Sequence, residues 1–305
     1  MKRREKYVCL LLLLLLGTEV FSQQEVRYTQ YMYNMNIINP AYAGARETLT
    51  INMLVRSQWT GIEGAPKTGT LSIHSPFSRY VGVGLTAIYD EIGPVKETNL
   101  FADFSYTIKM SEISNLAFGI KAGATFHNLN RRMLNPFDPN DIILINTVLN
   151  DLYPNIGIGA FFYMPRFYIG ISAPNLMKSK HFRVSSLGFT TQASEKVHYF
   201  VTAGYVIEVS NTVNLKPSIL LKTMVDTPVD LSLNALFNEA FELGISYRWE
   251  NSISIMVGMN VSDDFRIGYV YDYTLSGIGD YNSGSHELML LYDFNRRELK
   301  KRRYF

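Results

Sequence analysis

The chain has 305 residues, of which 47% are hydrophobic and 13% aromatic, and its formal net charge at pH 7 is +2. The large apolar share excludes a disordered chain. The near-zero net charge, without a basic stripe, gives no sign of a nucleic-acid partner.

Residues 1–22 have the form of a secretory signal peptide. "MKRREK" is a positive start, and "YVCLLLLLLLG" is an apolar stretch too short to cross a bilayer as a helix. We place cleavage after Ser22. The chain's one cysteine, Cys9, lies in this stretch, so the mature protein should be exported and without disulfides.

Residues 23–48 do not read as a strand. The stretch 28–44, "YTQYMYNMNIINPAYAG", carries no charge, is rich in Tyr, Asn and Met, and ends in a turn sequence. It precedes the first regular element.

From residue 49 to 294 the sequence alternates with a period of two. In "ISIMVGMNV" (253–261), the odd positions are apolar and most even positions are small or polar. No later stretch approaches about 18 consecutive apolar residues, so we expect no transmembrane helix. We expect about fourteen strands, at 49–56, 68–74, 81–89, 98–109, 115–126, 155–163, 166–172, 197–209, 213–224, 229–237, 241–249, 252–261, 264–273 and 285–294.

The lengths of the connections distinguish a membrane barrel from a soluble sandwich. Connections after even-numbered strands are short, whereas several after odd-numbered strands are long: 57–67, 127–154, 173–196 and 274–284. Short turns at one end and long loops at the other are typical of an outer-membrane barrel with both termini in the periplasm. A β-sandwich has no reason to sort its loops in this way. We therefore predict an all-β fold, a transmembrane antiparallel up-and-down β-barrel over 49–294.

The non-apolar face of these strands carries charges of both signs, which should face the lumen. We predict this of Arg56, Asp103, Lys109, Lys121, Lys216, Lys222, Glu242, Arg248, Arg266, Asp272 and Asp293. We also predict that 23–48 is a plug-like segment in or beneath the barrel. The residues expected to fill the lumen are Tyr31, Tyr33, Asn36, Asn39, Pro40 and Tyr42.

Motifs for catalysis or metal binding are weak. The five histidines (His74, His127, His181, His198 and His286) are not spaced as metal pairs. Ser285-His286-Glu287 is conceivable for a barrel lipase but is not a nucleophile elbow. Asp138, Asn140 and Asp141 lack the Gly and Glu of a calcium loop. We predict no enzyme, no metal and no cofactor.

The end of the chain, 295–305, is strongly basic. Its interpretation is open between a solvated terminus and a periplasmic strip that docks an acidic partner. The residues in question are Arg296, Arg297, Lys300, Lys301, Arg302 and Arg303.

Several motifs in a fixed order carry a resemblance to a known family. These are Gln30-Tyr31-Met32-Tyr33-Asn34, Asn39-Pro40-Ala41-Tyr42-Ala43-Gly44, Arg56-Ser57-Gln58-Trp59 and Gly64-Ala65-Pro66-Lys67-Thr68. Later echoes are "YPNIGIGAFF" (153–162), "GISAPNL" (170–176), "LKPSILLK" (215–222), "IGYVYDY" (267–273) and "GSHELMLLYDF" (284–294). Together they resemble the PorP/SprF family, over essentially the whole mature chain. Asn155 stands where the family usually has an aspartate.

The resemblance implies an outer-membrane barrel of Bacteroidota that serves type IX secretion and, in gliding species, surface adhesins. The implied partners are outer-membrane lipids, periplasmic secretion-system proteins or lipoproteins, and a large secreted adhesin. It implies no catalytic residues. We therefore expect a non-enzymatic membrane scaffold, with a small-solute porin as the alternative. A lumen filled by the N-terminal segment would favour the scaffold.

Overall fold

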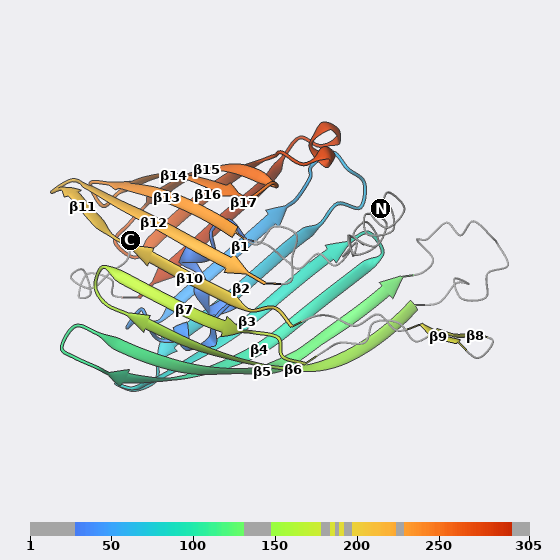
Figure 1. The fold of residues 1–305 in the computed structure, drawn as a ribbon, viewed down its shortest axis with the longest axis horizontal. Coiled ribbons are helices and arrows are strands. Elements are labelled where there is room, and N and C mark those ends of the chain that lie inside the picture. The colour runs from blue at the N-terminus through green and yellow to red at the C-terminus, as the bar shows by residue number, and fades with distance from the viewer. Residues whose placement is uncertain are drawn as a thin grey trace, which may run out of the picture.

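The computed structural model describes residues 28–130, 148–177, 184–186, 189–191, 197–223 and 229–294. The predicted signal peptide and the basic tail lie outside these residues, as do His181, Asp138, Asn140 and Asp141. The described chain is mostly strand, with a few short 3-10 helices (Figure 1). None of the helices in these ranges is long and apolar enough to cross a membrane.

The strands follow the predicted segments closely along the chain. They are β1 (Thr50–Ser57), β2 (Lys67–Pro76), β3 (Val81–Ile92), β4 (Val95–Lys109), β5 (Asn115–Asn130), β6 (Val148–Tyr163), β7 (Phe167–Ala173), β8 (Val184–Ser186), β9 (Phe189–Thr191), β10 (Phe200–Tyr205), β11 (Ile207–Ser210), β12 (Val213–Lys222), β13 (Val229–Phe237), β14 (Phe241–Arg248), β15 (Ser252–Asn260), β16 (Phe265–Thr274) and β17 (Ser285–Asp293).

The sheet closes on itself. Sequential neighbours pair antiparallel, β1 pairs with β17, and β10 pairs with both β7 and β12. β11 continues β10 along the same partner strand after a break at Val206. Among the described residues the ring therefore holds fourteen strands, which confirms the predicted barrel and strand number. β8 and β9 form a separate two-stranded sheet.

The alternation places polar side chains inside and apolar side chains outside. In β15, Ser252, Ser254 and Met256 are buried, while Ile255 on the opposite face is 60% exposed. This is the inverse of a soluble protein. It fits a wall whose outer face meets lipid and whose backbone groups are all paired by closure.

The two ends of the barrel differ in their connections. At one end, the short-turn end, the connections are 77–80, 110–114, 164–166, 211–212, 238–240 and 261–264. At the other end, the long-loop end, 58–66, 131–147, 174–199 and 275–284 are longer, although 93–94 and 249–251 are short. The short 3-10 helix η5 (Gly277–Tyr281) lies in the last of these loops.

Four strands extend further toward the long-loop end than predicted. β5 continues to Asn130 and β6 begins at Val148, so residues 127–130 and 148–154 of the predicted loop 127–154 belong to the ladder. The prediction ended where the apolar alternation ends, at Phe126. Beyond it the ladder continues between polar pairs, such as His127 Nδ1 with Glu97 Oε1 at 2.8 Å. β3 and β4 likewise meet at a turn of two residues, 93–94.

The outward face generates a stability prediction. Ile255 lies in the middle of β15, and Met259, also outward, lies near its end. Arginine at mid-membrane costs about 2–4 kcal/mol, whereas near the interface it costs about 0–1 kcal/mol. We expect Ile255→Arg to lower the free energy of unfolding far more than Met259→Arg. Urea titration in lipid vesicles measures both, and equal losses would contradict a lipid-facing Ile255.

Candidate functional site in the barrel lumen

The inner wall is charged, and its charges pair across strands. Every predicted inward charge is buried except Lys109, which is exposed because β4 ends there. The ion pairs of the wall are Arg56 with Asp272 (2.5 Å) and Glu287 (3.1 Å), Lys121 with Asp103 (3.2 Å), Arg248 with Asp230 (2.8 Å), and Arg266 with Glu242. Pairing of this kind offsets the cost of burying these charges.

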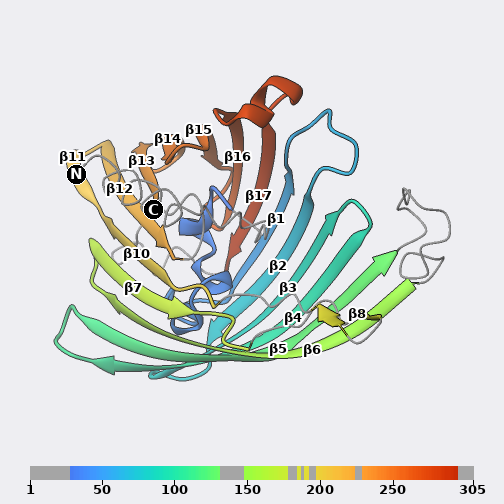
Figure 2. The ribbon, with the colours of Figure 1, turned by 45° about the vertical axis from the view of Figure 1, so that its right-hand side comes forward.

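Residues 28–48 lie within this ring of strands (Figures 1 and 2). They form three 3-10 helices, η1 (Tyr31–Tyr33), η2 (Met35–Ile37) and η3 (Pro40–Tyr42). Asn39 caps η3, because its Oδ1 accepts the Ala41 N–H at 3.0 Å, and proline suits the first helical position. All residues from 28 to 43 are buried, including every residue predicted to fill the lumen.

The first residues of the segment bind carboxylates at the long-loop end. Glu287 accepts the backbone N–H groups of Thr29 (3.0 Å) and Gln30 (2.8 Å). Thr29 Oγ1 donates to Asp272 at 3.1 Å. Both carboxylates also pair with Arg56, so one cluster joins the segment to β1, β16 and β17.

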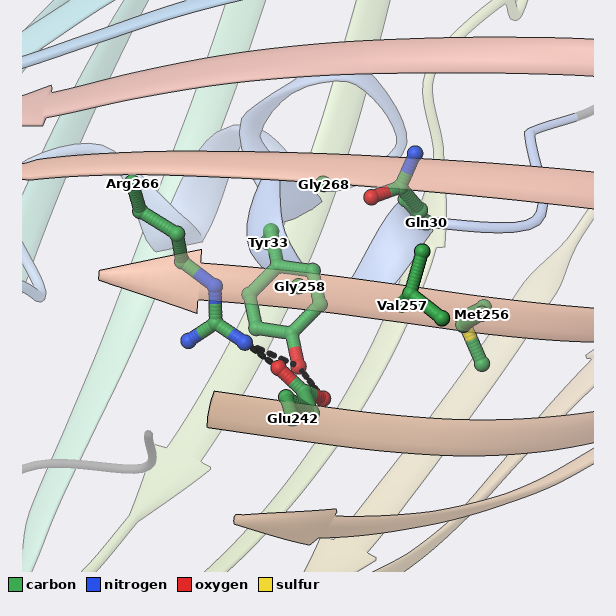
Figure 3. Close-up of a pocket in the computed structure, with 8 residues that line it drawn as sticks. All are labelled: Gln30, Tyr33, Glu242, Met256, Val257, Gly258, Arg266 and Gly268. Atoms are coloured by element: carbon green, nitrogen blue, oxygen red, sulfur yellow. Dashed lines mark hydrogen bonds and ion pairs between the residues drawn. The ribbon is translucent and has the colours of Figure 1, made fainter. Parts of the chain in front are cut away.

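Tyr33 contacts several polar and charged side chains of the wall, two of which are drawn in Figure 3. Its hydroxyl donates to Glu242 and accepts from Arg266 Nη2 and Asn234 Nδ2, each at 3.2 Å. The Arg266 guanidinium lies 4.3 Å from the ring centroid, and Lys216 Nζ lies 5.3 Å from it. The pocket beside the ring leaves about 10 Å³, room for about one water.

The hydroxyl of Tyr33 is a donor as well as an acceptor, so it can bond Glu242, Arg266 and Asn234 at the same time.

The middle of the segment contacts the opposite wall. Asn36 Nδ2 donates to Asp103 at 2.9 Å, and Lys121 Nζ donates to the carbonyls of Asn36 (3.2 Å) and Ile37 (3.3 Å). Ser172 Oγ donates to the Ile38 carbonyl at 2.6 Å. The wall thus satisfies backbone groups that η2 leaves open, so the segment is bonded to both sides of the lumen.

The segment leaves the lumen at the short-turn end. Tyr42 packs edge-on against His74 and Phe161, with ring centroids 5.5 and 5.4 Å apart. Arg46 then pairs with Asp293, the last residue of β17, at 2.6 Å. The chain enters β1 directly after this pair.

Glycines on the inner faces of the strands make room for the segment. A Cβ on Gly119 would lie 2.2 Å from Ala41 N, and one on Gly82 would lie 2.1 Å from the Ala43 carbonyl oxygen. On Gly159 and Gly268 it would lie 2.1 and 2.2 Å from side-chain oxygens of the segment. We did not predict these positions. The sequence did contain a signal: glycine occurs at inward-facing positions of these strands, where the neighbouring inward positions carry larger residues.

The other candidate motifs do not assemble a site. Ser285 and Glu287 face inward, whereas His286 lies on the outer face, where its Nδ1 is 2.6 Å from the Tyr269 hydroxyl oxygen. Ser285 Oγ instead accepts the N–H of Trp59 at 3.1 Å. Within the described ranges, no group of three His, Cys, Asp or Glu could hold a metal ion.

The inner glycines generate a prediction. We expect Gly119→Ala to destabilise the barrel by about 1–3 kcal/mol, because the new methyl group meets backbone rather than a flexible side chain. Gly69→Ala is the control, since a Cβ there meets nothing within 4 Å. The measurement is the temperature at which the folded band disappears from an SDS gel. The close approach is refuted if both variants melt together.

Comparison of the sequence with models of known families finds a match to one family. The model of the family described as type IX secretion system membrane protein PorP/SprF matches residues 20–292. No curated protein matches the sequence.

Solved structures match this chain at low identity and with TM-scores below 0.5. A FadL homologue of Pseudomonas aeruginosa is 12% identical with a TM-score of 0.48, over 84% of this chain and 93% of that chain. The CymD monoaromatic hydrocarbon channel is 12% identical with a TM-score of 0.48, over 90% and 95%. The KdgM porin is 8% identical with a TM-score of 0.40, over 81% and 99%.

Proposed function

The chain belongs to the PorP/SprF family of type IX secretion system membrane proteins, and from this premise we propose that it is a non-enzymatic outer-membrane scaffold for protein secretion. In this proposal the barrel anchors secretion components in the membrane, and residues 28–48 close its lumen to solutes. Its partners are periplasmic secretion proteins or lipoproteins and a large secreted surface protein.

The bonding of the segment to both walls supports a closed lumen. Tyr33 reaches β13, β14 and β16, while Asn36 and Ile37 bind β4 and β5. A loose strand passing through a pore would not be buried along 28–43. A scaffold needs a membrane anchor rather than an open path, so this filling favours a scaffold over a porin.

Conductance separates the two functions. We expect the intact protein to conduct poorly in planar bilayers, and a variant lacking residues 28–45 to conduct much better, because the segment fills the lumen. Heat modification on SDS gels checks that the shortened barrel has folded. Gly69→Ala, which leaves the segment untouched, is the matched control. Porin-like conductance of the intact protein would refute the closed lumen.

The basic tail is proposed as the periplasmic docking element. Phe294, the last described residue, donates its N–H to the Leu49 carbonyl at 2.9 Å, and this contact at the short-turn end supports a tail that starts there. Exposed basic residues mainly accelerate encounter with an acidic surface, and salt weakens this effect.

A charge-removal variant tests the docking role. We expect replacement of Arg296, Arg297, Lys300, Lys301, Arg302 and Arg303 by Ser to reduce co-purification of periplasmic secretion components, more strongly at low salt than at high salt. Heat modification confirms that the variant barrel is intact. Unchanged recovery at both salt concentrations would leave the tail as a solvated end.

A further inference from the structure

The direction in which residues 28–48 cross the lumen is fixed by contacts at both of its ends. Thr29 and Gln30 bind Glu287, and Thr29 binds Asp272. Glu287 lies two residues inside the start of β17, and Asp272 two residues inside the end of β16. Both positions are next to the loop 275–284, at the long-loop end.

The far end of the segment is at the opposite mouth. Arg46 pairs with Asp293, the last residue of β17, and Thr50 Oγ1 donates to the same carboxylate at 2.7 Å. Residues 29 to 46 thus run once along the lumen, from the long-loop end to the short-turn end. Tyr28, the first described residue, therefore lies on the long-loop side of the segment.

A return of the chain to the short-turn end would have to pass residues 28–43, which are buried within the ring. A second extended strand needs about 4.7–4.9 Å of lateral spacing from its neighbour. Beside Tyr33 the free space is about 10 Å³, and the inner glycines already admit backbone within contact distance. A chain that entered at the short-turn end would have to pass these residues a second time.

We infer that the chain threads the barrel from outside inward, so that Tyr28, the first described residue, lies at the cell-surface mouth. This rests on the outer-membrane location proposed above, with long loops outward. It differs from the expectation that both termini lie in the periplasm. Tyr28 and Phe294, the first and last described residues, then lie at opposite mouths of the barrel. A surface partner gains direct access to the segment that fills the lumen.

Single-cysteine labelling tests the direction in intact cells. Cys9 is the chain's one cysteine, so a Cys9→Ser background leaves each introduced thiol alone. We expect Val26→Cys to react with a membrane-impermeant maleimide in intact cells. Glu63→Cys, in the exposed loop 58–66, is the long-loop control, and Asn211→Cys, in the exposed turn 211–212, is the short-turn control.

The controls keep the two proposals separate. If Glu63→Cys labels in intact cells and Asn211→Cys labels only after permeabilisation, the barrel has the proposed location and orientation. Val26→Cys labelling with Glu63→Cys then supports threading from outside. Labelling of Val26→Cys only after permeabilisation, or only after unfolding, would overturn it while leaving the scaffold proposal standing. Failure of the two controls would instead count against the membrane orientation, and with it against both.

Discussion

Pairing of buried charge is the constraint on which the structure depends. The strands direct carboxylates, guanidinium groups and amines into an interior that their own backbone encloses. Removing one partner of such a pair costs about 3–5 kcal/mol, because the other charge stays buried. Segment 28–48 is part of this pairing. Glu287 uses both its oxygens on backbone N–H groups of the segment while Arg56 holds it from the wall. The wall and the segment therefore share the ligands of this buried carboxylate.

The same constraint explains why residues 28–45, which carry no charge, suit this interior. Charges on the wall largely neutralise one another, so a further charge in the lumen would lack a partner. Amides, phenols and open backbone groups can bond either sign of charge. Asn36 illustrates this, because its side-chain amide donates to Asp103 while its backbone carbonyl accepts from Lys121. Tyr33 does the same between Glu242 and Arg266.

Most of the barrel could be predicted from the sequence, because its outer face must be apolar along each strand. The predicted strands were too short where the apolar alternation ends. Beyond Phe126, β5 and β6 continue on polar pairs such as Asn128 with Asn150. Apolar alternation cannot reveal such pairs. For residues 28–48, composition indicated a plug-like segment, and the residues named for it are buried. It could not supply their partners, since Tyr33 meets residues more than 200 positions away. Only closure and register bring them together.

Asn39 lies where two neighbouring strands present glycine, and this has a consequence for assembly. A Cβ on Gly159 of β6 would lie 2.1 Å from its Oδ1, and one on Gly170 of β7 would lie 2.9 Å from its Nδ2. If β7 slipped by two residues, Tyr168 or Ser172 would replace Gly170 at this point, since inward positions alternate. A misregistered wall would then collide with the segment. The position of Asn39 is therefore compatible with the native register of β6 and β7 and not with this slipped one.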